Sequence, residues 1–204
     1  TETVTIKKVS LTWQPYQLFS GLLKIDDLTV NGLDINVSPT KDPEKKSADF
    51  ETGIQLPFQL DISNILITDV RFTSDGQLQT LDKLQLAAKT EVNQFKLLSL
   101  GINSDTLNAT AKGTVILDKG FPLNLQANWQ IKADKNGLWQ GLTTISGDFS
   151  KLVFDNQLAS PFKLALHGSV EDVLTTPRIT AQGDWHNLTW PLSASPPQIQ
   201  SPQG

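Results

Sequence analysis

Two histidines and a few paired carboxylates are the residues in this sequence that could take part in acid–base or metal chemistry. His167 and His186 both lie in strand-like runs, and the chain has no cysteine to join them as a metal ligand or nucleophile. The pairs Asp26-Asp27 and Glu171-Asp172 fall where turns are expected, and turns favour Asp because its side chain bonds nearby backbone N–H groups. A zinc site, a catalytic triad or a glycosidase pair would need help from distant groups. We therefore expect no enzyme and no metal site.

Five tryptophans are the remaining candidates for a binding function, because an exposed indole ring can stack on a sugar. Trp129 and Trp185 are in phase with apolar neighbours, which favours burial. Trp139, between Gly137 and Gly141, is expected to be the most exposed. A carbohydrate-binding β-domain is therefore one alternative. The glycines around Trp139 match neither a P-loop nor a dinucleotide fingerprint, so no cofactor is expected.

The charges are scattered along the chain. There are 17 basic and 21 acidic residues, with no basic stripe and no block of one sign, so nucleic acid is not expected as a partner. No run of about 18 apolar residues and no signal region occur, so an anchor or address is expected elsewhere in a longer parent chain. The absence of Met and the strand-like residues 1–4 also indicate a fragment.

The elements that must position these residues are strands. Apolar and polar residues alternate in short runs that end at Gly, Asn, Asp or Pro, which is typical of an antiparallel sheet with one covered face. An all-β fold is therefore expected, and Asn31-Gly32 predicts a hairpin. The best helical segment is short, covering residues 15–21 and ending at Gly21.

One β-rich segment is expected over residues 1–192. Within it, residues 38–53 are almost free of apolar side chains and predict an exposed, mobile polar loop. Residues 193–204 contain Pro196, Pro197 and Pro202, which cannot continue a ladder of backbone hydrogen bonds. A disordered tail is therefore expected after residue 192.

Several short motifs follow one another at characteristic spacings. In the C-terminal half they are GFPLNLQANW at 120–129, SGDFSKL at 146–152, residues 161–168, SVEDV at 169–173 and GDWHNLTWPL at 183–192. Near the N-terminus they are VSLTW at 9–13, LFSG at 18–21, LKI at 23–25 and LTVNG at 28–32. Their order and spacing resemble the TamB family of the AsmA-like superfamily, over most of residues 4–192.

The resemblance implies an elongated, antiparallel-rich sheet curled into a U-shaped trough with an apolar interior. It implies the periplasm of a diderm bacterium, with the parent chain anchored in the inner membrane and working with an Omp85-class outer-membrane partner. The family is associated with phospholipid movement between the membranes and with assembly of outer-membrane proteins. Phospholipid or another acyl chain is therefore the expected ligand, and the family has no catalytic residues to carry over.

The expected lining of this trough is the set of alternating apolar residues. They are Leu56, Phe58, Leu60, Ile62, Val70, Phe72, Leu84, Leu86, Leu98, Leu100, Val115, Leu117, Leu123, Leu125, Trp129, Phe162, Leu164, Leu166, Ile179 and Trp185. The same alternation would also form the dry core of a two-sheet β-sandwich. A protein-interaction module that receives client β-strands is a further alternative.

Overall fold

The computed structural model describes residues 3–37, 53–74, 77–133, 137–190, 192 and 199–204. Its elements are β1 (Thr3–Trp13), the 3₁₀ helix η1 (Pro15–Ser20), β2 (Leu22–Val37), β3 (Gln59–Ser74), β4 (Gln77–Glu91), β5 (Gln94–Asn103), β6 (Leu107–Ile116), β7 (Leu123–Lys132), β8 (Leu138–Asp148), β9 (Lys151–Ser160), β10 (Lys163–Glu171), β11 (Arg178–Trp190) and β12 (Ile199–Gln203). The short helix ends at Gly21, whose φ is 75°, as the sequence predicts.

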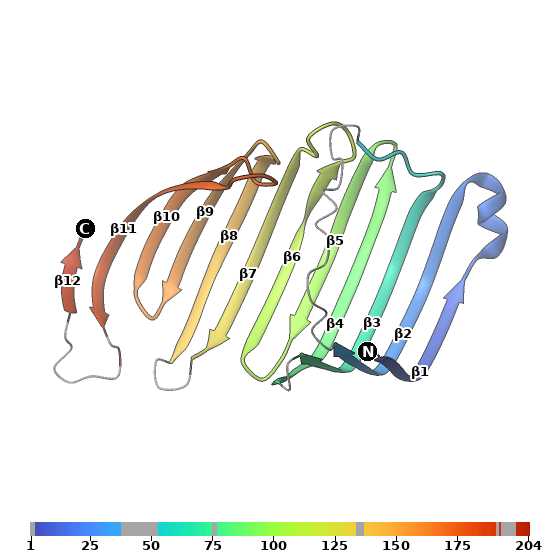
Figure 1. Cartoon of the computed structure of the whole chain (residues 1–204), viewed down its shortest axis with the longest axis horizontal. Helices are drawn as coiled ribbons and strands as arrows, with labels where there is room; N and C mark the ends of the chain where they lie inside the picture. The colour runs from blue at the N-terminus through green and yellow to red at the C-terminus, as the bar shows by residue number, and fades with distance from the viewer. Residues whose placement is uncertain (1–2, 38–52, 75–76, 134–136, 191, 193–198) are drawn as a thin grey trace.

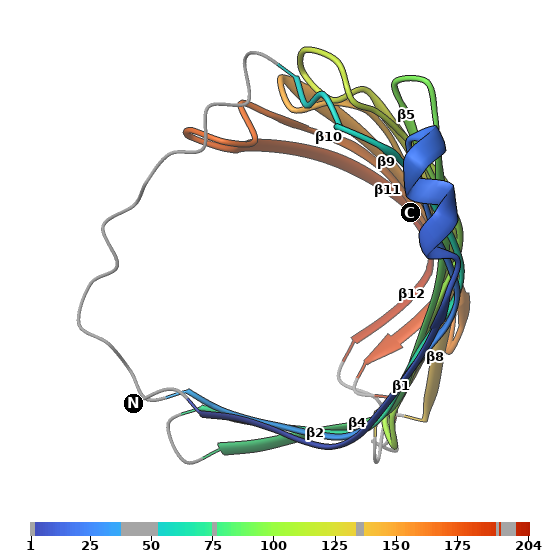
Figure 2. The same ribbon diagram turned by 90° about the vertical axis from the view of Figure 1, so that its right-hand side faces the viewer.

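All twelve strands belong to one sheet, and they lie in it in the order of the sequence. The sheet is a long row of strands, and each strand follows a curve, so the row forms a trough that is open along one side (Figures 1 and 2). The predicted all-β, curled and elongated sheet is confirmed. The two-sheet sandwich is wrong, because no second layer covers the sheet in the described ranges.

The trough has two rims where the chain passes from strand to strand. The lower rim of Figure 1 holds the start of β1 and the end of β2, and the upper rim holds the end of β1 and the start of β3. Neighbouring strands are antiparallel except β2 and β3, which are parallel, with Leu22 opposite Gln59. The chain between β2 and β3 therefore begins at the lower rim and ends at the upper rim. The predicted loop at 38–53 falls here and, apart from Gly53, lies outside the described residues.

A row of four residues interrupts the pairing of β1 to β4. Lys7, Gly32, Asp69 and Asp82 are each skipped in the ladders that join these strands. A second interruption lies nearer the upper rim, where the pairing of β2 with β3 skips from Ile25 opposite Ile62 to Leu28 opposite Ile65. Gly32 has φ 70° and Asp69 has φ 53°, so β2 and β3 turn sharply there. We call Lys7, Gly32, Asp69 and Asp82 the bend row. The predicted hairpin at Asn31-Gly32 is wrong, because β2 runs through this position to Val37.

Beyond the bend row the first four strands continue toward the open side of the trough as a short extension (Figure 2). We call this extension the shelf; it comprises residues 3–6, 33–37, 70–74 and 77–81.

The predicted disordered tail is corrected in part. Ile199–Gln203 form β12, which pairs with β11 so that Trp190 lies opposite Ile199 and His186 opposite Gln203. Pro202 is tolerated because β12 is the last strand of the sheet, and an edge strand needs hydrogen bonds on one side only. Residues 193–198 lie outside the described part of the chain.

Candidate functional site

The two faces of the sheet differ in chemistry. Residues opposite one another across β5 to β11 share a face, and one such row is Leu97, Gly113, Leu125, Ile145, Phe154, Gly168 and Ala181. The neighbouring row on the other face is Lys96, Thr114, Asn124, Ser146, Val153, Ser169 and Thr180. The first row has no polar side chain, whereas the second row is mainly polar.

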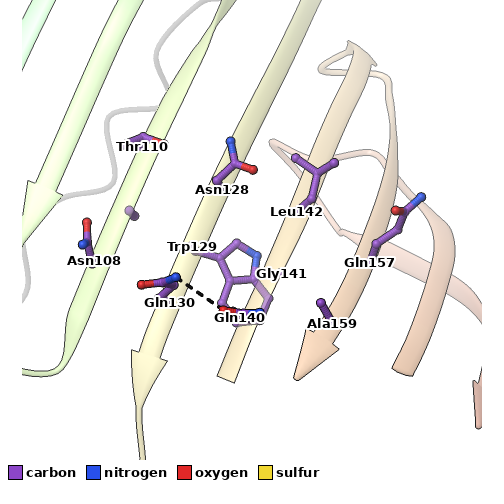
Figure 3. Close-up of a pocket in the computed structure, with 11 residues that line it drawn as sticks. Asn108, Thr110, Asn128, Trp129, Gln130, Gln140, Gly141, Leu142, Gln157 and Ala159 are labelled. Atoms are coloured by element: carbon purple, nitrogen blue, oxygen red, sulfur yellow. Dashed lines mark hydrogen bonds between the residues drawn. The ribbon is translucent and has the colours of Figure 1, made fainter. Parts of the chain in front are cut away.

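The polar face is the outer, convex one. Figure 1 looks into the open side, with strand numbers rising from right to left. In Figure 3 the numbers rise from left to right, so the view is from outside, onto a shallow hollow of about 480 Å³. Five of its lining residues carry amide side chains, namely Asn108, Asn128, Gln130, Gln140 and Gln157. The apolar face is therefore the inner, concave one.

Most of the predicted lining residues lie on this inner face. Those placed there by strand register are Leu60, Ile62, Leu84, Leu86, Leu100, Val115, Leu123, Leu125, Trp129, Leu164, Leu166, Ile179 and Trp185. Val70 and Phe72 follow the bend row and line a hollow together with Leu107, which is on the inner face opposite Ile131. Strand register therefore places these residues along the inner face, and their contact with a lipid stays a prediction.

Five predicted lining residues lie elsewhere. Leu98 is the extra residue of a bulge between Leu97 and Leu100, and it lines an outer hollow with Lys96. A bulge shifts the phase of a strand by one residue, so alternation counted across it fails. Four others precede or follow strands: Leu56 and Phe58 before β3, Leu117 after β6 and Phe162 before β10.

The prediction also missed inner-face residues on β5, β8 and β9. Leu97, Ile145, Phe154 and Leu158 lie there by register. Leu158 is 6% exposed and is among the few buried hydrophobic residues. The alternation Leu152, Phe154 and Leu158 could have identified β9, since only Asn156 interrupts it.

Very little of the apolar surface is closed off from solvent. Among the described residues the buried hydrophobics are Val30, Ala88, Phe121 and Leu158, and no large side chain is fully buried. The inner-face residues Leu125, Ile145 and Phe154 are all of intermediate exposure. An ordinary domain of this size covers such residues with a second layer. Here they line an open surface.

Glycines on the inner face make room for large neighbouring side chains. A Cβ built on Gly168 would lie 2.5 Å from the Phe154 ring, and one on Gly141 would lie 2.6 Å from the Trp129 ring. A Cβ built on Gly113 would lie 2.7 Å from Cδ2 of Leu125, and one built on Gly183 would lie 2.7 Å from Cδ2 of Leu166. The side chains therefore fold along the sheet instead of projecting into the trough, which keeps its interior free.

Several polar side chains of the inner face are hydrogen-bonded. Trp129 Nε1 donates to Thr143 Oγ1 at 3.0 Å, and Asn156 Nδ2 donates to the same hydroxyl at 2.6 Å. Trp139 is half-buried, with its ring edge-on to Phe162 at a centroid distance of 5.7 Å. The expectation that Trp139 is the most exposed indole is therefore wrong, and Trp13 is 39% exposed.

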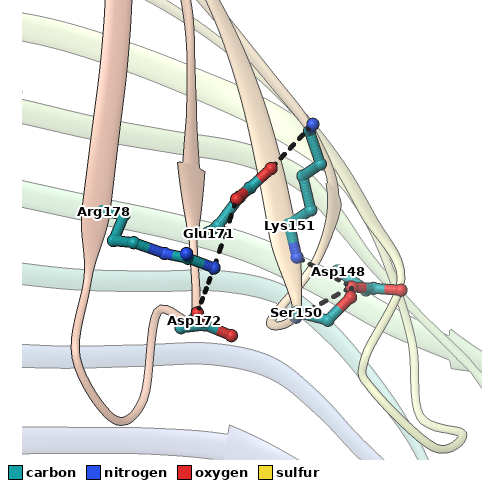
Figure 4. A network of polar contacts seen from close by, with 6 residues as sticks. All are labelled: Asp148, Ser150, Lys151, Glu171, Asp172 and Arg178. Atoms are coloured by element: carbon teal, nitrogen blue, oxygen red, sulfur yellow. Dashed lines mark hydrogen bonds and ion pairs between the residues drawn. The ribbon is translucent and has the colours of Figure 1, made fainter.

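One network of charged groups lies at the upper rim of the trough. Lys151 Nζ lies 3.0 Å from Glu171 Oε1, and Arg178 lies 2.8 Å from Asp172 Oδ2 (Figure 4). The hydrogen bond from Lys151 lowers the pKa of the Glu171 carboxyl below its ordinary value. These exposed pairs tie the turns after β8 and β10 together, and each contributes little to stability.

Both histidines are exposed. His167 Nδ1 lies 2.6 Å from Asp155 Oδ1 on the outer face, with both side chains more than half exposed. In the part of the chain that the structure describes, no group of three His, Cys, Asp or Glu residues is placed to hold a metal ion. The described helical residues include no helix with the length and apolarity to cross a membrane.

Comparison with known proteins gives one match. The family model described as the TamB N-terminal domain matches residues 49–204. The comparisons with curated proteins and with solved structures found no match. The family match covers more than half of the chain, including every strand from β3 to β12. This chain therefore belongs to the TamB family.

Proposed function

We propose that this segment carries phospholipid along its inner face, as part of a TamB-type bridge in the bacterial envelope. The single observation that supports it best is an open trough of one sheet whose inner face is apolar and uncovered. In this proposal the segment lies in the periplasm, the parent chain is anchored in the inner membrane, and other parts of it engage an Omp85-class partner. Support for outer-membrane protein assembly is part of the same proposal, and no catalytic step is.

The physical reason is the gain from burying acyl chains. Each methylene removed from water contributes about 0.8 kcal/mol, and the headgroup can stay in water at the open side. Leu123, Leu125 and Ala127 of β7 offer a continuous apolar surface with no charge. A lipid on this surface meets no specific polar partner that would hold it in one place, so it can slide.

The test is a charge placed on one face or the other of the same strand. Leu125→Asp puts a carboxylate on the inner face, and Gln126→Asp puts it one residue away on the outer face. Protein purified from a bacterial envelope is analysed by native mass spectrometry, and its lipids are extracted and quantified. We expect phospholipid on the wild type and on Gln126→Asp, and its loss from Leu125→Asp.

A folding control separates loss of lipid from loss of structure. In an open trough water reaches the new carboxylate, so Leu125→Asp should keep the wild-type circular dichroism spectrum. Inside a closed core it would be a buried unpaired charge and would unfold the domain. Wild-type protein without lipid, or equal lipid loss from both variants, would rule the proposal out.

A second candidate function is the binding of client β-strands. It is favoured by a separate observation, the open lower edge of β4, where residues 77–81 pair with β3 and have no strand on their other side among the described residues. Carbohydrate binding is less favoured, because Trp129, Trp139 and Trp185 are all half-buried.

A further inference from the structure

Strand β4 is longer than its neighbour β5 at the lower rim. The pairing between them ends with Lys83 opposite Asn103. On its other side β4 stays paired with β3 as far as Gln77, which lies opposite Ser74. Residues 77–82 therefore have a strand on one side and, among the described residues, no strand on the other. The shelf thus ends in an unpaired edge within the row of strands.

A hollow of about 600 Å³ lies beside this edge. Its apolar wall consists of Val70, Phe72 and Leu81 from the shelf and Leu107 from the start of β6. Its remaining lining residues are Gln79 and Thr80 of the edge itself and Ser104, Asp105 and Thr106 of the turn after β5. The hollow therefore joins an exposed backbone edge to an apolar surface.

The two features recognise different parts of one ligand. On a strand, the N–H and C=O groups of alternate residues point to the same side, so about three residues of 77–82 present theirs to the open edge. Such an edge pairs with an extended backbone. The hollow beside it accepts the side chains that project from one face of that backbone.

The charge of the hollow distinguishes a peptide from a phospholipid. Asp105 is the one charged residue among those that line it, and it is exposed. An anionic phosphate beside this carboxylate would be repelled and would find no cation in the lining. A peptide segment with a basic residue would be attracted to it.

We propose that the edge at residues 77–82 and the adjoining hollow bind an extended segment of a partner protein by strand addition. The segment is about six residues long, has alternating apolar side chains that enter the hollow, and carries a basic residue near Asp105. This site is separate from the inner wall at Leu125, and it does not depend on lipid carriage.

The test uses a peptide of defined chemistry. The probe is a fluorescein-labelled octapeptide of alternating Val and Thr ending in Lys, and its matched control is the same peptide N-methylated at alternate amides. Fluorescence anisotropy measures binding, and hydrogen exchange followed by NMR measures protection of amides 77–82. We expect the first peptide to bind and to protect alternate amides of this segment, and the methylated peptide to bind at least about tenfold more weakly.

Two variants of β3 locate the bound side chains. Val70→Trp fills the hollow and should weaken binding of the octapeptide by about tenfold. Thr73→Trp places the same ring on the other face of the shelf and should leave binding unchanged. Circular dichroism checks that both variants fold.

Three results would overturn the inference: equal binding of both peptides, no gain of protection at 77–82, or unchanged binding by a folded Val70→Trp. If Val70→Trp loses copurified phospholipid but binds the octapeptide as the wild type does, the hollow is a lipid site, and this result would also overturn the inference. The lipid proposal is tested separately at Leu125, so either proposal can fail without the other.

Discussion

The strands β1 to β4 and the strands β5 to β10 curve by different means. In β1 to β4 the strands turn sharply at the bend row, where Gly32 and Asp69 take positive φ angles, and a separate register shift lies between Ile62 and Ile65. From β5 to β10 the ladders run from rim to rim, apart from the bulge at Leu98 and a register shift at Gln140. The first region is folded at a line, and the second is curled gradually.

The difference shows how one sheet obtains both an open wall and a free edge. Gradual curling keeps every neighbour paired, so the inner face of β5 to β10 stays continuous. The bend lets β1 to β4 run on past the end of β5, so residues 77–82 have no neighbouring strand on one side within the described part of the chain. The proposed lipid surface depends on the first geometry, and the proposed peptide site depends on the second.

The largest effect is expected from filling a glycine position in the curled wall. Gly168 has no room for a Cβ, which would lie 2.4 Å from the Thr180 carbonyl oxygen and 2.5 Å from the Phe154 ring. Gly168→Val should lower the free energy of unfolding by about 3 kcal/mol, because overpacking forces neighbours out of place. Urea denaturation followed by tryptophan fluorescence measures the change.

Gly101 provides the matched control for this substitution. It lies on the outer face, where a Cβ would be 3.9 Å from the Gln85 Cβ, an ordinary contact. Gly101→Val should leave stability unchanged or raise it slightly, since valine suits a strand better than glycine. Equal destabilisation by both variants would contradict the distinction between a packed inner face and an open outer one.

A smaller effect is expected at the bend row. Gly32 has φ 70°, and a Cβ there would lie 2.3 Å from Cδ of Lys7, whose ammonium reaches Asp69 at 2.7 Å. Gly32→Ala should cost about 1 kcal/mol for the left-handed backbone, plus the cost of moving the Lys7 side chain.

The comparison variant is Gly137→Ala. Gly137 has φ 74° and nothing within 4 Å of its Cβ position, so it reports the backbone cost alone. Thermal unfolding measures the loss of stability in both variants. The extra loss in Gly32→Ala is the cost of moving the Lys7 side chain. If Gly32→Ala is no worse than Gly137→Ala, the packing of Lys7 across the bend has no role in stability.

The sequence predicted the curled wall better than the bend. In β7 and β10 strict alternation identified Leu123, Leu125, Leu164 and Leu166, because nothing interrupts the period of two. At Leu98 a bulge changes the phase without any marker such as Gly or Pro. Alternation describes a single strand, whereas a bulge depends on how two strands are paired.

The errors at Gly32 and Pro202 have a similar origin. A glycine with positive φ serves a hairpin turn or a bend within a strand, and the neighbours in the sheet decide which. Gly32 lies between Lys7 and Asp69, two residues distant in sequence, and the bend belongs to all three strands. The sequence predicts that Pro202 ends the ladder, yet it lies on an edge strand, and which strand lies at the edge is a property of the whole sheet.

The smallest effect concerns surface ion pairs, which occur in both regions. At the bend row the hydrogen bond from Lys7 lowers the pKa of Asp69. At the upper end of β4, Lys89 Nζ lies 2.6 Å from Glu91 Oε1 and Lys96 donates to Oε2. These two hydrogen bonds, that from Lys89 first, lower the pKa of Glu91 from 4.5 to about 2.

The lowered pKa of Glu91 determines how this residue contributes to stability at different pH values. Because the pKa of Glu91 is lower in the folded chain, its contribution to stability is present above about pH 4.5 and is lost as the pH falls toward 2.

Replacing Lys89 and Lys96 together by Met should return the pKa of Glu91 toward 4.5, as measured by an NMR titration of its carboxyl carbon. Lys112→Met, on neighbouring β6, should leave the pKa near 2. A pKa that stays near 2 without the two lysines would show that they are not its cause. Since all these groups are exposed, the titration should shift while the urea midpoint at pH 7 barely moves, in contrast to the glycine variants of the wall.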